Sequence, residues 1–168
     1  ILMVILAKWI LENHPNARIA IVTDRDELDK QIERVFKDTE EKIYRTRSGK
    51  DLLNQLREPN PRLLCSLVHK FGRKDVDNFN KFIKELEDNA PEVSGGLFVF
   101  VDECHRSHTG DLHRAMKELL PDATFIGFTG TPLLKIDKTN SIATWGEYIH
   151  SYKYNDAVSD KVVLDLRY

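Results

Sequence analysis

The stretch that decides the fold is residues 97–105, LFVFVDECH, in which five apolar residues run directly into two acids. An apolar run of this length is typical of a strand that is buried on both faces of a parallel sheet. Asp102 and Glu103 therefore stand where a buried strand meets solvent. Carboxylates at such a position are poorly suited to packing, but they are well suited to holding a metal-bound phosphate.

A second strand-like run, residues 124–128 (TFIGF), leads into Thr129, Gly130 and Thr131, which a proline follows. These residues form only a turn if Gly and Pro act here as ordinary loop residues. Because they follow the next strand after the acidic pair, we instead expect their hydroxyls to transmit the state of a bound nucleotide to another surface. One acidic and one hydroxyl-rich strand end together suggest a nucleotide-dependent motor domain.

Segments of strand length alternate with segments of helical periodicity along the chain. The strand-like segments are residues 18–22, 63–68, 97–101 and 124–128, and the helix-like segments are residues 1–13, 27–36, 48–56, 74–92 and 111–120. Strands that are apolar on both faces and separated by helices predict an α/β fold, in which helices flank a mainly parallel sheet.

The composition of the whole chain limits the possible functions. Its 168 residues correspond to about one domain, and a net charge of −2 provides no general basic field for nucleic acid. Any DNA contact must therefore come from a local face. Cys65 and Cys104 are too few for a disulfide framework, which favours the reducing cytoplasm, and no apolar stretch is long enough to span a bilayer.

Both ends of the sequence predict that the chain is a piece of a longer protein. Residues 1–11 (ILMVILAKWIL) read as the body of a buried helix with no capping residue before it. Residues 162–168 (VVLDLRY) read as a strand that has no terminating loop.

Ligands of parallel α/β sheets bind beyond the carboxyl ends of the strands, where the acidic pair is predicted to lie. We expect Asp102 to hold Mg²⁺ through water, and Glu103 to orient or deprotonate the water that attacks a terminal phosphate. The alternative is that both are solvated acids that cap the next helix. Five polar residues at the ends of two other strands are candidates for contacts with a phosphate backbone: Thr23, Asp24, Arg25, His69 and Lys70. Helix capping and ordinary surface charge are the alternative for this group.

The histidines near the acidic pair raise the question of zinc, but the spacing of Cys104, His105, His108 and His113 matches no common tetrahedral pattern. We interpret His105 as a polar relay between the acids and the hydroxyls. His108 and His113 are expected to be surface or capping residues.

Residues 47–51 (RSGKD) look like the end of a phosphate-binding loop, but two positions do not fit. Asp51 stands where such a loop has Ser or Thr, and Tyr44 stands where it has its upstream glycine. The sequence contains no Gly-Lys-Ser/Thr, so we conclude that it lacks this loop.

Three motifs together resemble those of superfamily-two helicases and translocases: residues 22–31 (VTDRDELDKQ), 102–105 (DECH) and 129–132 (TGTP). The Asp-Arg-x-x-Leu-Asp-x-Gln arrangement in the first motif is similar, more narrowly, to the motor (R) subunit of type I restriction-modification enzymes. Residues 145–152 (WGEYIHSY) and 155–158 (NDAV) are similar to the same subunit, so the resemblance runs essentially from end to end.

The resemblance implies that residues 1–168 form most of the first RecA-like motor domain, a three-layer α/β domain, of an enzyme that pumps duplex DNA with ATP. It assigns Asp102 and Glu103 as the Walker B acids. It assigns Thr129, Gly130 and Thr131 to the motif that couples ATP hydrolysis to movement. The DNA-facing residues that it implies are Thr23, Asp24, Arg25, Ser66, His69 and Lys70.

The same resemblance implies ATP and Mg²⁺ as cofactors, and duplex DNA with modification and specificity subunits as partners. It places the phosphate-binding loop before Ile1 and a second RecA-like domain after Tyr168, so we expect no ATP hydrolysis by residues 1–168 alone. Three alternatives stay open. Another superfamily-two helicase would lack nuclease residues upstream, a non-catalytic nucleotide-fold binding module would be indifferent to changes at Glu103, and a metal-binding regulatory domain would retain metal on purification.

Overall fold

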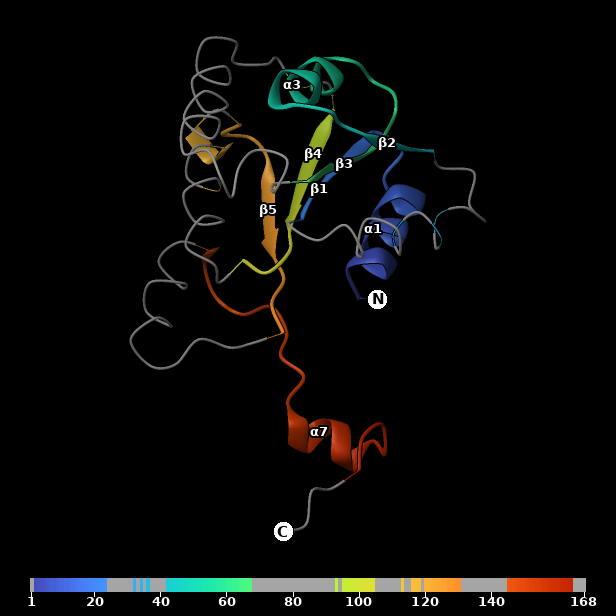
Figure 1. The fold of residues 1–168 in the computed structure, drawn as a ribbon, viewed down its shortest axis with the longest axis vertical. Helices are drawn as coiled ribbons and strands as arrows, with labels where there is room; N and C mark the ends of the chain where they lie inside the picture. Colours follow the sequence, from blue (N-terminus) through green and yellow to red (C-terminus); the bar gives the residue numbers. More distant parts are fainter. Residues whose placement is uncertain are drawn as a thin grey trace.

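Five parallel strands form a single sheet in the computed structural model, which describes residues 2–23, 32, 34, 36, 42–67, 93, 95–104, 113, 116–118, 120–130 and 145–164. The strand order is β2-β3-β1-β4-β5, with β1 at the centre (Figure 1). The strands are β1 Ala17–Thr23, β2 Ile43–Arg45, β3 Leu63–Leu67, β4 Gly96–Val101 and β5 Thr124–Gly127. The helices with described bounds are α1 Leu2–Asn13, α3 Gly49–Arg57 and α7 Tyr154–Ser159.

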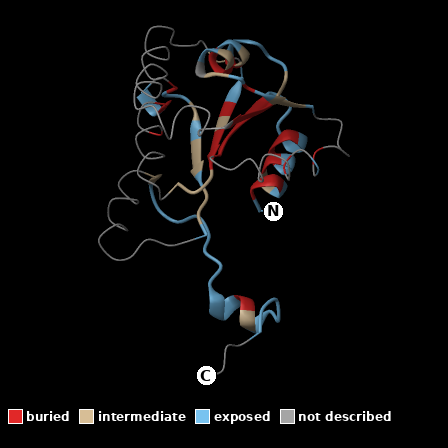
Figure 2. Cartoon of the chain, viewed as in Figure 1, coloured by how far each residue is buried: buried red, intermediate tan, exposed pale blue. Residues whose placement is uncertain are grey.

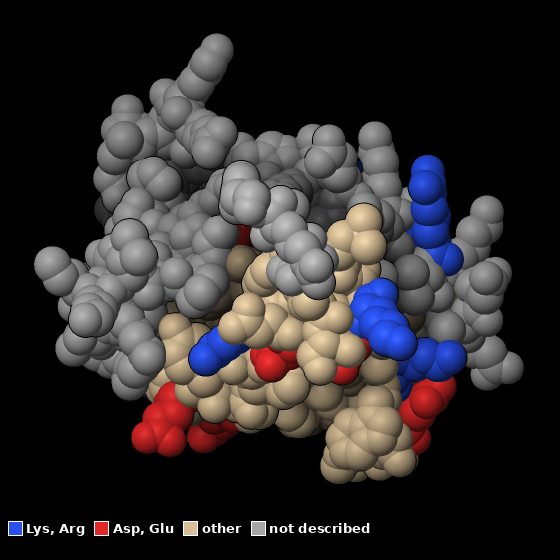
Figure 3. Space-filling view, turned by 90° about the horizontal axis from the view of Figure 1, so that it is seen from below, with Lys and Arg blue, Asp and Glu red and all other residues tan. Residues whose placement is uncertain are grey.

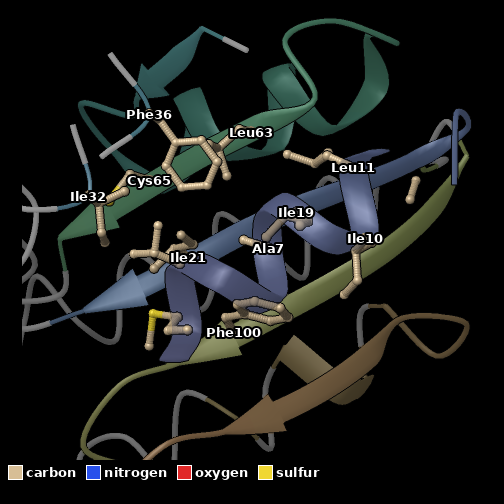
Figure 4. Packing of buried hydrophobic residues seen from close by; sticks show 13 residues of the cluster. Ala7, Ile10, Leu11, Ile19, Ile21, Ile32, Phe36, Leu63, Cys65 and Phe100 are labelled. Atoms are coloured by element: carbon tan, nitrogen blue, oxygen red, sulfur yellow. The ribbon is translucent and has the colours of Figure 1, made fainter. Parts of the chain in front are cut away.

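The central strand β1 is buried at all of its positions, because apolar side chains cover both faces of the sheet. Successive side chains of a strand point to opposite faces. Accordingly, Ile19 and Ile21 lie in the cluster that contains α1, whereas Ala20 and Val22 lie in the cluster that contains α3. Figure 4 shows α1 lying across one face of the sheet, where Ala7 and Ile10 pack with Ile19, Ile21 and Phe100. The predicted three-layer RecA-like α/β fold is therefore confirmed.

Helix α1 uses one side to cover the sheet, through Met3, Val4, Ala7, Ile10 and Leu11. This spacing is that of one face of an α-helix. The predicted helix over residues 1–13 is confirmed for α1. After the helix ends, the guanidinium of Arg62 donates hydrogen bonds to the carbonyl oxygens of Leu11 and His14, both at 2.8 Å, and of Ala17 at 3.1 Å.

Helix α3 begins where the sequence predicts, because Ser48 caps it. The Ser48 hydroxyl accepts a hydrogen bond from the Asp51 backbone amide at 3.1 Å, which satisfies one of the free donors in the first turn. Three leucines on one face, Leu52, Leu53 and Leu56, then pack into the cluster on the second face of the sheet. The Gly-Lys pair in this stretch thus forms the start of a packed helix.

Arg18 is a charged residue within the apolar central strand, and it is only 2% exposed. Its guanidinium donates to the carbonyl oxygens of Gln55 and Leu56, each at 2.6 Å, and to that of Pro61 at 3.2 Å. Burial lowers the pKa of Arg18, and the charge of Glu58 opposes that shift. The arginine therefore satisfies the last carbonyls of α3 from inside the core, where a cation also interacts favourably with the helix dipole.

The strands predicted at residues 18–22, 63–68, 97–101 and 124–128 are confirmed as β1, β3, β4 and β5, with small differences at their ends. The sequence did not indicate β2, a three-residue edge strand that is only partly buried. Residues 32, 34 and 36 are helical, as are residues 113 and 116–118, whereas residue 120, at the end of the second predicted helix, is not. The other residues of these two predicted helices, and the helix predicted at 74–92, lie outside the described residues.

The strand expected over residues 162–168 is wrong for residues 162–164, and the remaining four residues lie outside the described ones. The amides of Val162 and Val163 donate instead to the Ala157 carbonyl in α7, at 2.9 and 3.3 Å. Lys161 before them has a left-handed backbone, with φ of 59°. These residues therefore close the end of a helix, and valine-rich composition does not decide their conformation.

Candidate functional site

The acidic pair follows β4 at the carboxyl edge of the sheet, as predicted, in a turn formed by residues 102–104. The Asp102 amide donates to the carbonyl of Val22 in β1 at 2.9 Å, and the Cys104 amide donates to the carbonyl of Phe128 after β5 at 3.1 Å. Hydrogen bonds to the strands on both sides thus hold the turn. Between these anchors Glu103 has a φ of 48°, a left-handed conformation that costs energy for a residue with a side chain.

The side chain of Asp102 contacts the end of the central strand. The Thr23 hydroxyl donates a hydrogen bond to Oδ2 of Asp102 at 3.3 Å. The contact arises because β1 and β4 are parallel neighbours with Val22 opposite Val101, so that the next residue of each strand reaches the same edge. Asp102 and Glu103 are themselves partly exposed, which leaves them accessible from solvent.

The acidic turn is also joined to the segment that carries the predicted coupling residues. Phe128 donates from its amide to the Val101 carbonyl at 2.8 Å and accepts from the Cys104 amide at 3.1 Å. Thr129, which is partly buried, and the exposed Gly130 follow directly. The structure therefore brings Asp102, Glu103, Thr129 and Gly130 to one edge, while His105 and Thr131 lie outside the described residues.

Close packing beneath the turn depends on Gly127, the last residue of β5. A Cβ atom at this position would lie 2.8 Å from Sγ of Cys104, closer than real Cβ atoms approach, and 3.0 Å from Cε3 of Trp145, which is tighter than most real contacts. Glycine therefore allows β5, the acidic turn and residue 145 to meet. Burial, together with the charges of Asp102 and Glu103, raises the pKa of the Cys104 thiol to about 11, so this thiol is protonated at neutral pH.

The prediction that His113 is a surface or capping residue is wrong, since its side chain is only 3% exposed. The ring stacks on Trp145 with centroids 3.9 Å apart, and it meets Phe125 edge-on at 4.9 Å. His113 lies three and seven residues before the buried Met116 and Leu120, which is the spacing of one helix face. Burial, and to a lesser degree the charge of Lys117, lowers the pKa of His113 to about 4.

The residues predicted to face DNA are only partly described. Thr23 is 1% exposed and Ser66 is 3% exposed, so neither side chain offers a free surface in this structure. Asp24, Arg25, His69 and Lys70 lie outside the described residues. Their contact with DNA stays a prediction.

The described part of the edge fits a magnesium ion that is held mainly by water. Within the described residues, no three His, Cys, Asp or Glu side chains form a cluster that would enclose a metal. Mg²⁺ needs no such cluster, because it keeps several waters and binds one or two carboxylates together with the phosphates of its ligand. Asp102, a partly exposed carboxylate beside a hydroxyl, is a donor of this kind.

Charges of both signs occur on the face seen in Figure 3. In Figure 3, Lys and Arg side chains gather mainly on the right of the described surface, and Asp and Glu side chains lie along its lower margin and between uncharged residues near its middle. Among the described residues no helix combines the length and the apolar character that a bilayer span requires.

An acidic turn at the carboxyl edge of a parallel, helix-covered sheet is the arrangement of a RecA-like ATPase domain. The chain belongs to the SWI2/SNF2 ATPase family, whose model matches residues 1–168.

Relatives with established names agree with the resemblance predicted from the motifs. The type I restriction enzyme HindI endonuclease subunit of Haemophilus influenzae is 32% identical to this chain over an alignment 168 residues long. The alignment covers 91% of this chain and 15% of the relative. The type I restriction enzyme endonuclease subunits SauCOLORF180P of Staphylococcus aureus and SsaAORF53P of Staphylococcus saprophyticus are 29% and 28% identical, and each match covers 88% of this chain. The chain spans 16% of the length of each of these two relatives.

Proposed function

We propose that this chain is part of the ATP-dependent motor of a type I restriction endonuclease subunit that translocates duplex DNA, and that it supplies the two acids used for hydrolysis in the intact subunit. The observation that carries the proposal is the acidic turn, which is hydrogen-bonded on one side to β1 and on the other to the segment after β5. Membership of an ATPase family and the names of the relatives support the same assignment.

In this proposal the two acids have different tasks. Mg²⁺, when bound with ATP, neutralises charge on the phosphate oxygens. Asp102, directly after β4, would hold that ion. Glu103, whose backbone is left-handed, would orient the attacking water and accept its proton.

Coupling to movement uses the segment after β5. A change in the position of the acidic turn would act on Phe128 through the hydrogen bond that the Cys104 amide donates to its carbonyl, and Thr129 and Gly130 come next in the chain. Thr131 complements these two residues, and His105 is the proposed relay between them and the acids. Such a connection is short, and it is made of backbone atoms that no side-chain substitution removes.

The proposed partners are duplex DNA and the modification and specificity subunits of a restriction complex in the cytoplasm. Arg25, His69 and Lys70 are the proposed donors to the DNA backbone, and Asp24 belongs to the same proposed DNA-facing motif. These contacts would carry little sequence information, because phosphate contacts position a protein without specifying bases.

The proposal is tested by the ATPase activity of the full-length protein, with its partner subunits, in the presence and absence of duplex DNA. Glu103→Gln should leave ATP binding intact and lower hydrolysis by a factor of about 10² to 10⁴, because a positioned general base is lost. The matched control is Glu147→Gln, an exposed acid far along the chain, which should leave turnover unchanged.

Two outcomes would contradict the proposal. Absence of turnover even with DNA and partner subunits would exclude a motor, and turnover that is indifferent to Glu103 would leave a nucleotide-binding module. Residues 1–168 alone should show no turnover, because their sequence contains no Gly-Lys-Ser/Thr loop.

A further inference from the structure

Thr23 was grouped by sequence with residues that face DNA, yet its hydroxyl lies against the acid expected to hold the metal. We infer that Thr23 is a positioning residue for Asp102, which it holds by Oδ2 in the orientation used for metal-bound nucleotide, and that it is not a DNA contact. This inference rests on the proposed function.

The backbone places the two residues together. Val22 and Val101 are partners in the parallel pairing of β1 with β4, and the Asp102 amide donates to the Val22 carbonyl at 2.9 Å. Thr23 and Asp102 therefore each follow directly after a member of the register pair Val22–Val101 on the neighbouring strands β1 and β4. The position of each is set by the sheet, so their contact does not depend on a mobile loop.

Burial separates the two possible roles of Thr23. With 1% of its surface exposed, the side chain cannot reach a phosphate of DNA unless the edge of the sheet rearranges. Buried hydroxyls are almost always hydrogen-bonded, and the carboxylate of Asp102 lies within reach at 3.3 Å. An ionised carboxylate only accepts, so the hydroxyl is the donor.

The hydrogen bond from Thr23 limits rotation of the Asp102 carboxylate about its terminal torsion, which the covalent geometry of aspartate restricts only weakly. The terminal torsion of aspartate has a broad minimum, so a hydrogen bond to one carboxylate oxygen narrows the range of orientations. Occupying Oδ2 selects one orientation before the ligand arrives. Loss of the hydroxyl should therefore weaken metal-dependent nucleotide binding and leave metal-free binding unchanged.

The test uses the full-length protein and a fluorescent ADP analogue, whose binding is titrated at several Mg²⁺ concentrations. Thr23→Val keeps the shape of the side chain and removes the donor, and we expect it to raise the Mg²⁺ concentration needed for half-maximal binding by about three- to tenfold. Thr23→Ser keeps the donor and should stay within about twofold of the wild type. Duplex-DNA binding, measured by fluorescence anisotropy, should be the same in all three proteins.

A double-mutant cycle with Asp102→Asn shows whether the effect passes through Asp102. In the Asp102→Asn background, Thr23→Val should produce little further change in the Mg²⁺ requirement, because the charged acceptor is already absent. Equal effects in both backgrounds would show that Thr23 acts independently of Asp102, which would overturn the inference. The unfolding midpoint of each variant identifies general destabilisation, and Thr23→Ser provides the comparison if Thr23→Val folds poorly.

Other outcomes also decide the question. Weaker DNA binding by Thr23→Val with an unchanged Mg²⁺ requirement would restore the DNA-facing role and overturn the inference. No change in either property would show that the hydrogen bond has no functional part. Failure of the wild-type protein to bind the nucleotide analogue would instead refute the proposed function, and the inference with it, before any variant is compared.

Discussion

His113 shows how strongly its surroundings can change the chemistry of one residue. Its ring is enclosed by Trp145 and Phe125, and within the described residues its Nδ1 atom is buried with no hydrogen-bond partner. The cost of burying a charge there keeps the imidazole neutral, with a pKa of about 4. This histidine is therefore an aromatic packing residue, although its sequence position near the acids suggested a polar surface role.

The burial of His113 predicts a pH dependence of stability. Unfolded histidine has a pKa near 6.5, so between about pH 6.5 and pH 4 the unfolded chain binds a proton that the folded chain excludes. The free energy of unfolding contributed by His113 is therefore fully present above that range and is lost as the pH falls through it. Between pH 7 and pH 5 the loss should be about 2 kcal/mol.

Urea denaturation of the protein at these two pH values checks this prediction, with His113→Phe as the variant that keeps an aromatic ring and cannot titrate. Between pH 7 and pH 5, the free energy of unfolding of the variant should fall by about 2 kcal/mol less than that of the wild type. Equal losses in the two proteins would mean that His113 does not titrate differently on unfolding.

At the scale of elements, two arginines donate hydrogen bonds to the carbonyl oxygens at the ends of the helices that cover the sheet. Arg18 is buried, and Arg62 is partly buried. Arg62 binds the carbonyls at the end of α1, and Arg18 binds those at the end of α3. Four carbonyls at the end of every helix lack partners within the helix. Because α1 and α3 cover opposite faces, these two residues fix both helical layers to the edge of the sheet that lies opposite the acidic turn.

Substitution of Arg18 should destabilise the fold considerably. Arg18→Met keeps most of the side-chain volume but leaves the carbonyls of Gln55, Leu56 and Pro61 without this donor, and we expect a loss of about 3 to 5 kcal/mol in the free energy of unfolding. Arg18→Lys should lose less, because one ammonium can satisfy only part of the set.

The measurement is chemical denaturation, with Lys50→Met on the exposed side of α3 as the control. The control should change stability by no more than about 0.5 kcal/mol. A similar small change for Arg18→Met would show that solvent replaces the arginine at these carbonyls, and it would contradict the interpretation.

On the scale of the whole molecule, the described structure has apolar side chains outside its core in two places. Leu2, Ile5 and Trp9 lie on the side of α1 that does not face the sheet, and each is more than half exposed. A second group in residues 145–164 includes Ile149 and Leu164, which are 86% and 89% exposed. Figure 2 shows this segment, with α7, as a largely exposed extension away from the sheet.

Exposed apolar surface of this extent predicts that residues 1–168, produced alone, associate with one another. Sedimentation velocity at several protein concentrations should show a sedimentation coefficient that rises with concentration. The double variant Ile5→Ser with Trp9→Ser should reduce this rise, whereas Glu12→Gln on the same helix should not. A wild-type chain that stays monomeric at every concentration would contradict the prediction.

Much of this arrangement was predictable because its signals are local. Mainly apolar runs of five or six residues indicated β1, β3, β4 and β5, and the position of Asp102 and Glu103 after such a run indicated the edge at which they lie. The helical pattern of residues 48–56 indicated α3, whose first turn is capped by the hydrogen bond from the Asp51 amide to the Ser48 hydroxyl, three residues away. The short edge strand β2 was not predicted, since two partly buried residues and one exposed residue carry too little periodicity to distinguish a strand from a loop.

The sequence by itself determined the parallel α/β sheet, the acidic strand end and the family resemblance, because each is carried by the order of residues within short segments that can be read one at a time. Only the tertiary structure decided which side chains meet: Thr23 with Asp102, Cys104 with Gly127, and His113 with Trp145. The residues in each pair are far apart in the chain. They come together through strand pairing and packing between layers, which depend on the register of the whole sheet and cannot be seen in any single segment.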